Sequence, residues 1–217
     1  MAGTVRHPTG RYGGRSAQER RAERRQRLLD AGLRLFGDSP GYRATSVTAL
    51  CEAAGLSTRQ FYEEFAGLEE VLAALHLFVN DQAEQATLAA LAESEGLDLE
   101  HRAAAAFRAY ASAATSDPRH IRIAFVEIVG VSPRLERQRL VRRARWVELI
   151  RAAAVEAAER GEAAPRDYRL AATAFIGAVN GLLHDWTAGQ VDATLDEIVD
   201  ELVLVLVGMA RPAGWRA

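Results

Sequence analysis

The sequence predicts an all-α protein, with a three-helix helix-turn-helix unit first, a larger helical bundle after it, and about nine helices in total. Apolar residues recur at helical spacing along most of the chain, and strand-like alternation is absent. Glycine and proline interrupt this pattern at intervals that suit short connections. The stretch from Thr45 to Phe65 (TSVTALCEAAGLSTRQFYEEF) has the further pattern of two short helices joined by a tight turn.

Length and composition exclude several classes of protein. The chain has 217 residues, enough to bury a core, and 49% of them are hydrophobic. No apolar run approaches the roughly 18 residues that span a bilayer, and the N-terminus lacks the apolar core of a signal peptide. We therefore expect a cytoplasmic protein without a membrane partner. The single cysteine, Cys51, excludes an intramolecular disulfide framework and a cysteine-built zinc site.

Charge is distributed unevenly along the chain. Residues 1–66 hold 11 Arg and 7 acidic residues, a balance of +4, whereas residues 67–217 hold 16 Arg and 22 acidic residues, a balance of −6. Every basic residue is arginine, because the chain has no lysine. A basic front part predicts a nucleic-acid-binding domain joined to a domain with another purpose.

The first helix is preceded by a tail. Residues 1–16 mix Gly, Pro, Thr and Arg without periodicity, which predicts disorder. From Ala17 the pattern is helical, and its first half is rich in arginine up to Arg27. These arginines either contact DNA phosphates, with the tail in a minor groove, or form a solvated charged face. The segment Gly37 to Gly41 ends the helix.

The next helix has four small or apolar residues on one face, at i, i+3, i+4 and i+7. They are Val47, Leu50, Cys51 and Ala54. Gly55 follows, where a helix end tolerates positive φ. Ser57 and Gln60 have the spacing of a capping box for the third helix, and Phe61 and Phe65 would anchor that helix on the second. In such a unit, the later of the two helices that flank the turn can enter the major groove of DNA.

Further helices follow to the end of the chain, each bounded by glycine, proline or a capping residue. The predicted ranges are 68–92, 99–115, 118–130, 133–161, 166–187 and 194–210.

Several short motifs together resemble the N-terminal domain of the TetR family of bacterial transcriptional regulators, over residues 17–83. The motifs are GYRATSV at 41–47, AAGLS at 53–57 and FYEEF at 61–65, with Leu29, Ala31, Phe36, Glu69 and Leu72. The resemblance implies a tail over 1–16, a DNA-binding domain over 17–66 with its motif at 46–65, and a ligand-binding and dimerisation domain over 67–217. It also implies a homodimer formed through 166–187 and 194–210. Such a dimer would bind a palindromic double-stranded DNA operator as a repressor, and a small-molecule ligand would release it.

The expected DNA-binding residues lie in and before the second helix of the motif. They are Arg43, Thr45, Ser57, Thr58, Arg59, Gln60 and Tyr62. By resemblance, the hydroxyls of Thr45 and Tyr62 meet phosphates, although Thr45, or Ser46 in its place, can instead cap the start of the helix that follows them. Arg59 can pair with guanine, and Gln60 either pairs with adenine or stays in the capping box.

Three residues depart from the family pattern. Leu68 stands where the family often has a lysine that contacts phosphate, and Glu63 and Glu64 place acid on the recognition helix. These departures keep open the alternative of an interaction adaptor that retains the fold without operator binding. A helical ligand-binding enzyme with an incidental helix-turn-helix is the other alternative.

A ligand pocket is expected among aromatic and polar residues of the later helices, beside the small residues Ala103 to Ala106. The candidates are Phe78, Phe107, Tyr110, Phe125, Glu127, Trp146, Phe175, Asn180 and His184. Each aromatic residue can equally be ordinary core, and Asn180 and His184 can face a dimer partner. The expected ligand is largely apolar.

No catalytic or cofactor motif accompanies these residues. The five histidines have no paired spacing of the metal-binding kind, and the nucleophile-elbow, P-loop and dinucleotide patterns are absent. We expect a protein that is not an enzyme and that uses neither a metal nor a cofactor.

The tail yields a testable prediction. Deleting residues 1–16 should weaken operator binding and flatten its salt dependence, because each lost arginine–phosphate contact removes about one unit from the slope of log affinity against log salt. Gel shifts at several salt concentrations measure this slope. An unchanged slope would show that the tail does not contact DNA.

Overall fold

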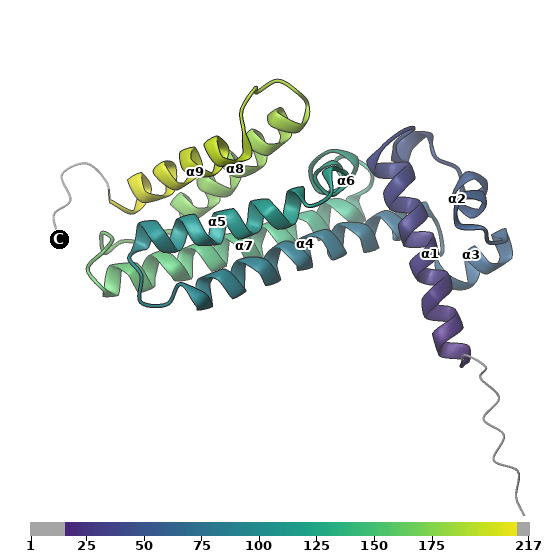
Figure 1. The fold of residues 1–217 in the computed structure, drawn as a ribbon, viewed down its shortest axis with the longest axis horizontal. Helices are drawn as coiled ribbons and strands as arrows, with labels where there is room; N and C mark the ends of the chain where they lie inside the picture. Colours follow the sequence, from purple (N-terminus) through teal and green to yellow (C-terminus); the bar gives the residue numbers. More distant parts are fainter. Residues whose placement is uncertain (1–15, 212–217) are drawn as a thin grey trace, which may run out of the picture.

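The computed structural model describes residues 16–211, and within this range the protein consists of nine α-helices without a β-strand (Figure 1). The helices are α1 Ala17–Gly37, α2 Val47–Ala54, α3 Thr58–Glu64, α4 Leu68–Glu93, α5 Leu99–Thr115, α6 Pro118–Arg122, α7 Pro133–Glu159, α8 Arg169–Thr187 and α9 Leu195–Ala210. A 3₁₀ turn, η1 (Tyr42–Ala44), and a π-helical segment, η2 (Ile123–Glu127), complete the order. The predicted all-α fold class is confirmed. The arginine-containing tail lies outside the described residues, except for Ser16.

Helices α1, η1, α2 and α3 form a small unit at one end of the molecule, which we call the head. Helix α1 runs across the long axis of the molecule, and α2 and α3 lie on its outer side (Figure 1). A capping box starts α1, because the Ser16 hydroxyl accepts from the Glu19 N–H and the Glu19 carboxylate accepts from the Ser16 N–H. Leu28, Ala31 and Phe36 are the buried apolar side chains of α1.

The tight turn between α2 and α3 has the predicted geometry. Gly55 has φ +62°, and the Leu56 N–H donates to the Cys51 carbonyl at 3.0 Å, closing the end of α2. From α1, the Arg27 guanidinium donates to the Gly55 carbonyl at 2.9 Å. A side chain on Gly55 would meet that guanidinium at 2.7 Å, in a backbone conformation that already favours glycine. The first and second helices are therefore joined at this turn.

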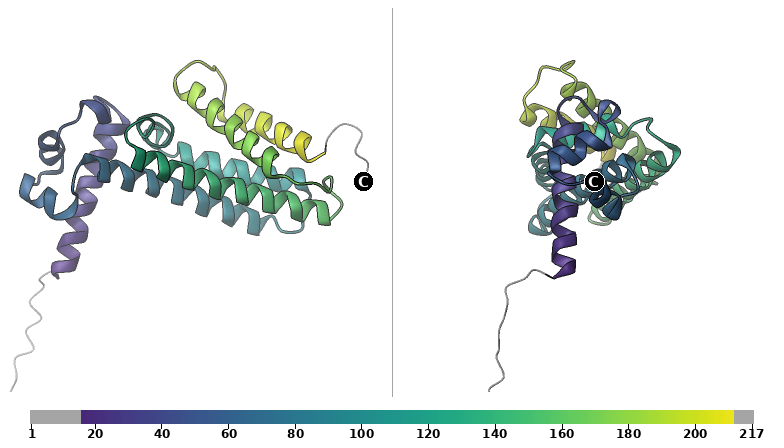
Figure 2. Two further views of the ribbon diagram at one scale, coloured as in Figure 1. Left: turned by 180° about the vertical axis from the view of Figure 1, so that it is seen from behind. Right: turned by 90° about the vertical axis from the view of Figure 1, so that its right-hand side faces the viewer.

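The remaining six helices, α4 to α9, form an elongated bundle. Helices α4, α5 and α7 run along the long axis, and α8 and α9 cover them on one side (Figures 1 and 2). Helix α4 packs along α5, α5 packs against α9, and α7 packs against α8. Within the described range, no helix is long and apolar enough to cross a membrane.

The core of the head continues into the bundle. Val71 and Leu72 of α4 are buried together with the apolar residues of α1 to α3. Ile128 and Leu135, which follow much later in the chain, belong to the same cluster and are fully buried. Although the chain passes from head to bundle at Gly67, the two parts share apolar packing.

The start of α8 differs from the predicted range 166–187. The helix begins at Arg169, because the preceding residues bind the end of α9 instead. The Ala164 N–H donates to the Ala210 carbonyl at 2.9 Å, and the Arg166 guanidinium donates to the Met209 carbonyl at 2.6 Å. These hydrogen bonds satisfy the C-terminal carbonyls of α9, which have no partner within their own helix.

One buried polar residue, His76, joins α4 to α7. Its side chain is 2% exposed, and its Nδ1 lies 3.2 Å from the Gln138 amide nitrogen, which also donates to the Ala73 carbonyl. Burial lowers the pKa of His76 to about 4, and the nearby positive charges of Arg142 and Arg139 act in the same direction. A neutral imidazole can accept the amide proton of Gln138.

This histidine makes stability depend on pH. The His76 pKa of about 4 lies below the ordinary value of 6.5, so the unfolded chain binds a proton that the folded chain excludes. Stability should therefore be fully present above pH 6.5 and fall by up to about 3 kcal/mol as pH drops towards 4. His76→Gln should flatten this part of the curve of unfolding free energy against pH, measured by urea denaturation.

His101 provides a control of opposite sign, because its hydrogen bond with Asp98 raises its pKa. His101→Gln should remove a contribution that is present at low pH, and so make the fall towards acid steeper. If His76→Gln leaves the curve unchanged, His76 is not the group responsible.

Candidate functional site

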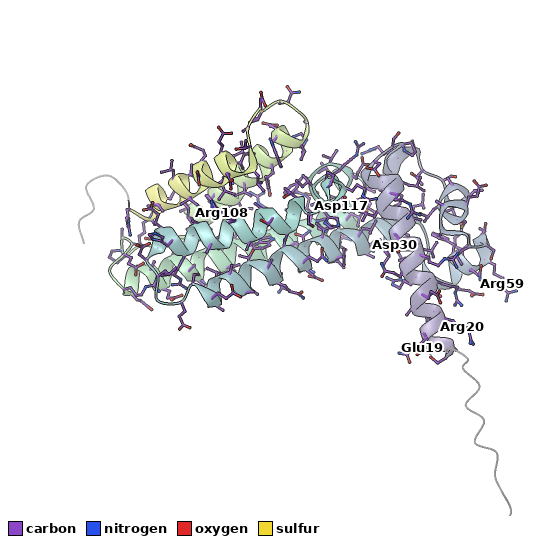
Figure 3. The ribbon with its side chains drawn as sticks, viewed as in Figure 1. Glu19, Arg20, Asp30, Arg59, Arg108 and Asp117 are labelled. Atoms are coloured by element: carbon purple, nitrogen blue, oxygen red, sulfur yellow. The ribbon has the colours of Figure 1, made fainter. Side chains whose placement is uncertain are left out.

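The outer face of α3 carries the most exposed of the predicted DNA-binding side chains. The Arg59 side chain is 90% exposed, and Tyr62 is 58% exposed although its neighbour Phe61 is fully buried. Figure 3 shows Arg59 at the outer end of the head, directed away from the other helices. Thr58 is also exposed, in the first turn of α3.

The capping box at the start of α3 uses Gln60. The Ser57 hydroxyl accepts from the Gln60 N–H at 3.3 Å, and the Gln60 side-chain oxygen accepts from the Ser57 N–H at 2.9 Å. Of the two predicted roles for Gln60, the structure adopts the capping role. A bidentate pair with adenine needs that oxygen as an acceptor, so it would require Gln60 to leave the box.

Thr45 differs from its expected role. Its side chain is buried, and its hydroxyl donates to the Gly41 carbonyl at 2.8 Å. A hydroxyl has one proton, so Thr45 in this geometry has none to donate to a phosphate. Ser46 takes the capping role instead, accepting from the Ala49 N–H at 3.1 Å. Thr45 thus holds the turn before α2.

Glu64, which was expected to add acid to the recognition helix, is buried. Its side chain is 0% exposed and lies between two arginines of α1, with Arg21 Nε and Arg24 Nη2 at 3.0 and 2.9 Å from its carboxylate oxygens. Arg25 donates to the Glu64 carbonyl at 3.1 Å and stacks over the Phe65 ring at 4.1 Å. Pairing neutralises a charge that would be costly to bury alone. Three arginines of α1 therefore hold α3 in place.

Two other predicted contributors to the DNA surface already have partners. Arg59 Nε lies 3.3 Å from the Glu63 carboxylate, one turn along α3, and both side chains are exposed. Arg43 is exposed and donates to the Gly130 carbonyl at 3.3 Å, which lies beyond η2. Leu68 is half-buried against the core of the head, where its side chain serves packing.

The bundle contains a cavity of about 370 Å³ that is partly open to solvent. This volume is at the lower end of the range for small-molecule sites. Its lining comes from α4 to α9 with η2 and is mostly apolar. Ala103 and Ala106 of the alanine run are part of the wall, and their small side chains leave room there.

Six of the nine predicted pocket residues line this cavity, and three do not. The lining six are Phe107, Tyr110, Phe125, Trp146, Asn180 and His184. Phe175 is fully buried behind the wall, with its ring 5.1 Å from that of Phe107. Phe78 is 46% exposed and packs edge-on against His120, and Glu127 faces the head. Phe175 is thus ordinary core, the alternative given for each aromatic residue.

The polar part of the lining was mostly missed from the sequence. His76 and Asn80 line the cavity from α4, and His120 lines it from α6. His76 and Asn80 lie one helical turn apart, on the same face as the lining residue Ala83, a spacing that is visible in the sequence. The described lining also includes five arginines, on α5, on α7 and immediately after α7.

The wall of the cavity touches the head through α6 and η2. The Glu127 carboxylate accepts from the Tyr42 N–H at 2.9 Å and from Arg122 Nε at 2.8 Å, so it joins η1 to the bundle. At the end of α1, a Cβ on Gly37 would lie 2.4 Å from the Cβ of Arg119, so α1 and α6 approach without an intervening side chain. His120, Ile121 and Phe125 of the same segment line the cavity.

Known protein families match both the head and the bundle of this chain. The family described as "Bacterial regulatory proteins, tetR family" matches residues 28–75, and "Tetracyclin repressor-like, C-terminal domain" matches residues 96–210, more than half of the chain. A search of curated proteins found no match.

Several solved structures share the fold. FadR from Bacillus subtilis, solved in complex with stearoyl-CoA, has a TM-score of 0.73 and 16% identity, covering 85% of this chain and 98% of its own. PfmR from Thermus thermophilus has a TM-score of 0.68 and 25% identity, covering 83% and 97%. AibR, solved with isovaleryl coenzyme A and operator DNA, has a TM-score of 0.65 and 22% identity, covering 87% and 98%.

These matches span both the head and the bundle, and they confirm the resemblance noted from the sequence motifs. The chain belongs to the TetR family of bacterial regulatory proteins.

Proposed function

We propose that this TetR-family regulator is a repressor that binds a palindromic operator as a homodimer and leaves it when a small molecule fills the bundle cavity. The observation that carries the proposal is the combination of an exposed α3 face with a largely apolar, partly open cavity whose wall touches the head. As a regulator of bacterial transcription it would act in the cytoplasm.

The energetics of α3 favour DNA contact by Arg59. Its ion pair with Glu63 is exposed, and such pairs contribute about 0–1 kcal/mol. A bidentate pair with guanine provides about 1–3 kcal/mol of discrimination, so exchanging Glu63 for a base is favourable. Glu64 does not oppose this, because its charge is buried against Arg21 and Arg24. Glu64 was one of the three departures that favoured an adaptor without DNA binding, and its burial removes it from that argument.

Dimerisation through α8 and α9 is supported by their outer faces. Leu170 of α8 is 70% exposed and Leu204 of α9 is 65% exposed, the two highest values among the large apolar side chains that are described as exposed. After Leu170 along α8, small exposed residues recur at helical spacing: Ala174, Ala178 and Gly181. Small residues allow close approach of a second helix, and apolar side chains there would be buried in a dimer.

The ligand that we propose is a small, largely apolar molecule, and two relatives suggest its class. FadR and AibR were solved with acyl-coenzyme A thioesters. An acyl chain suits the apolar side chains of the cavity, such as Phe107, Trp146 and Ile150.

Glu127 is the proposed link between ligand and operator. It bonds the head at Tyr42, while its neighbours in η2, Ala124 and Phe125, line the cavity. A ligand that displaces this wall would change how the head is held, and therefore the spacing of the two recognition helices in a dimer.

Replacing the α3 contacts tests DNA binding. Arg59→Ala should weaken binding to DNA from the promoter region beside the gene by about 5- to 150-fold, the equivalent of 1–3 kcal/mol, and Tyr62→Phe should weaken it less by removing one hydroxyl. Fluorescence anisotropy with labelled promoter DNA measures both. Arg108→Ala is the matched control, since Arg108 is on α5, away from the head (Figure 3). Equal affinity of the Arg59 variant and the wild type would refute the proposed surface.

Removing the Glu127 link tests the coupling. Glu127→Gln loses the charge that holds Tyr42 and Arg122, so dodecanoyl-CoA should still bind but should release promoter DNA less effectively, with at least a fivefold smaller change in DNA affinity. Calorimetry measures ligand binding and anisotropy measures release. Glu148→Gln, which breaks an exposed pair with Arg151 on α7, is the control and should respond like the wild type. A normal response of the Glu127 variant would exclude this route.

A further inference from the structure

The ligand cavity carries positive charge within its apolar wall. Five of its described lining residues are arginines, and no described lining residue is aspartate or glutamate. A cavity that bound a purely apolar molecule would not need guanidinium groups in its lining. Whether these arginines already have carboxylate partners therefore bears on the class of ligand that the cavity binds.

Four of the five arginines already have carboxylate partners behind the wall. The pairs are Arg102 with Glu156, Arg139 with Glu136, Arg142 with Glu84 and Arg160 with Glu162, at N–O distances of 2.9, 2.7, 3.3 and 2.8 Å. Their charges are locally neutralised, and they connect α4, α5 and α7 or stabilise the end of α7.

Arg143 is the exception. It lies on α7, is partly buried, and has no carboxylate within ion-pair distance among the residues that the structure describes. Its one hydrogen bond there is long, from Nη2 to the Thr173 carbonyl of α8 at 3.5 Å. A guanidinium group has five N–H donors, so most of those of Arg143 remain available.

The neighbouring face of α8 adds a second free polar group. Thr173, Gly177 and Asn180 follow one another at i, i+4 and i+7 and so share a face. Gly177 has no side chain, and a Cβ there would be 3.8 Å from Arg143 Nη2, which leaves the guanidinium uncovered. Asn180 lines the cavity, and within residues 16–211 its amide makes no hydrogen bond. His184, one turn further, is hydrogen-bonded to Asp185 at 3.2 Å.

We infer that Arg143 and Asn180 form an anion subsite of the ligand cavity, and that the ligand is an amphipathic anion with an aliphatic chain. The inference rests on the proposed function and names the chemistry of its ligand. The chain lies against the apolar wall, and the carboxylate or phosphate at its end accepts hydrogen bonds from Arg143, with Asn180 as a neutral donor beside it.

The physical basis is a guanidinium group in the cavity lining that has no counter-ion among the described residues. Hydrogen bonds between a guanidinium group and a carboxylate or phosphate are about twice as strong as neutral ones, and no carboxylate within residues 16–211 competes for the group. A neutral chain of the same length gains the apolar contacts but leaves Arg143 unpaired. The subsite therefore discriminates by charge, while the wall discriminates by shape.

Isothermal titration calorimetry with three twelve-carbon probes tests the inference. Dodecanoate and dodecanoyl-CoA carry anionic groups, whereas 1-dodecanol is neutral, and each is used below its micellar concentration. Wild-type protein should bind at least one anionic probe at least tenfold more tightly than the alcohol. The tighter of the two anions identifies a free acid or a thioester as the source of the charge.

Variants on α7 assign the effect to Arg143. Arg143→Gln should weaken binding of the preferred anion at least tenfold and change binding of 1-dodecanol less than threefold, while Arg143→Lys should restore most of the affinity. Arg137→Gln removes the same charge from an exposed position outside the cavity, and it should bind like the wild type. Thermal unfolding of all three variants checks that they are folded.

Three results would overturn the anion subsite: equal affinity for the alcohol and the anions, no loss of affinity in folded Arg143→Gln, or no binding of either anion. Promoter binding by the wild type is measured in parallel. If the wild type binds the promoter and any of these three results is found, the subsite fails and the proposed function stands. If the wild type does not bind the promoter, the proposed function itself fails.

Discussion

Helix α4 contributes side chains both to the core of the head and to the wall of the cavity. The arrangement of the head relative to the cavity depends on this shared helix. Val71 and Leu72 are buried among the apolar residues of the head, and about one to three turns later His76, Val79 and Ala83 line the cavity. An α-helix is stiff over this distance because each turn is hydrogen-bonded to the next. The orientation of the head is thus tied to the shape of the cavity wall by a continuous element.

Arginine performs several distinct tasks in a chain that has no lysine. In α1, Arg21 and Arg24 neutralise a buried carboxylate and Arg27 holds a turn, so part of the basic first third serves internal structure. On α3, Arg59 remains at the surface with only a weak partner. In the bundle, Arg143 has no carboxylate partner within the described range, unlike its lining neighbours. The planar, forked guanidinium suits all of these bidentate or carbonyl-directed contacts better than an ammonium group.

Local signals in the sequence were sufficient for the helices and their caps, because capping boxes, Gly55 and the proline starts depend on residues within one turn. The start of α8 escaped prediction, since it depends on contacts with the end of α9. The same limit applies to the site. Exposure of Tyr62 follows from its position next to Phe61, whereas burial of Glu64 depends on arginines about 40 residues earlier. Glu127 and Phe175 are expected in the pocket because of the helices that carry them, and only tertiary packing separates them from it.

The missing side chain at Gly37 has a mechanical consequence. The Cβ of Arg119 in α6 lies against the backbone of α1 at Gly37, and a Cβ is fixed by the backbone of its own helix. A shift of α6 would therefore be passed to α1 with little loss to side-chain rotation at this contact. A movement of α1 would then also move α3, because Arg21 and Arg24, near the other end of α1, hold α3 through its buried carboxylate. At this joint, the smallest residue in the chain makes the contact rigid rather than loose.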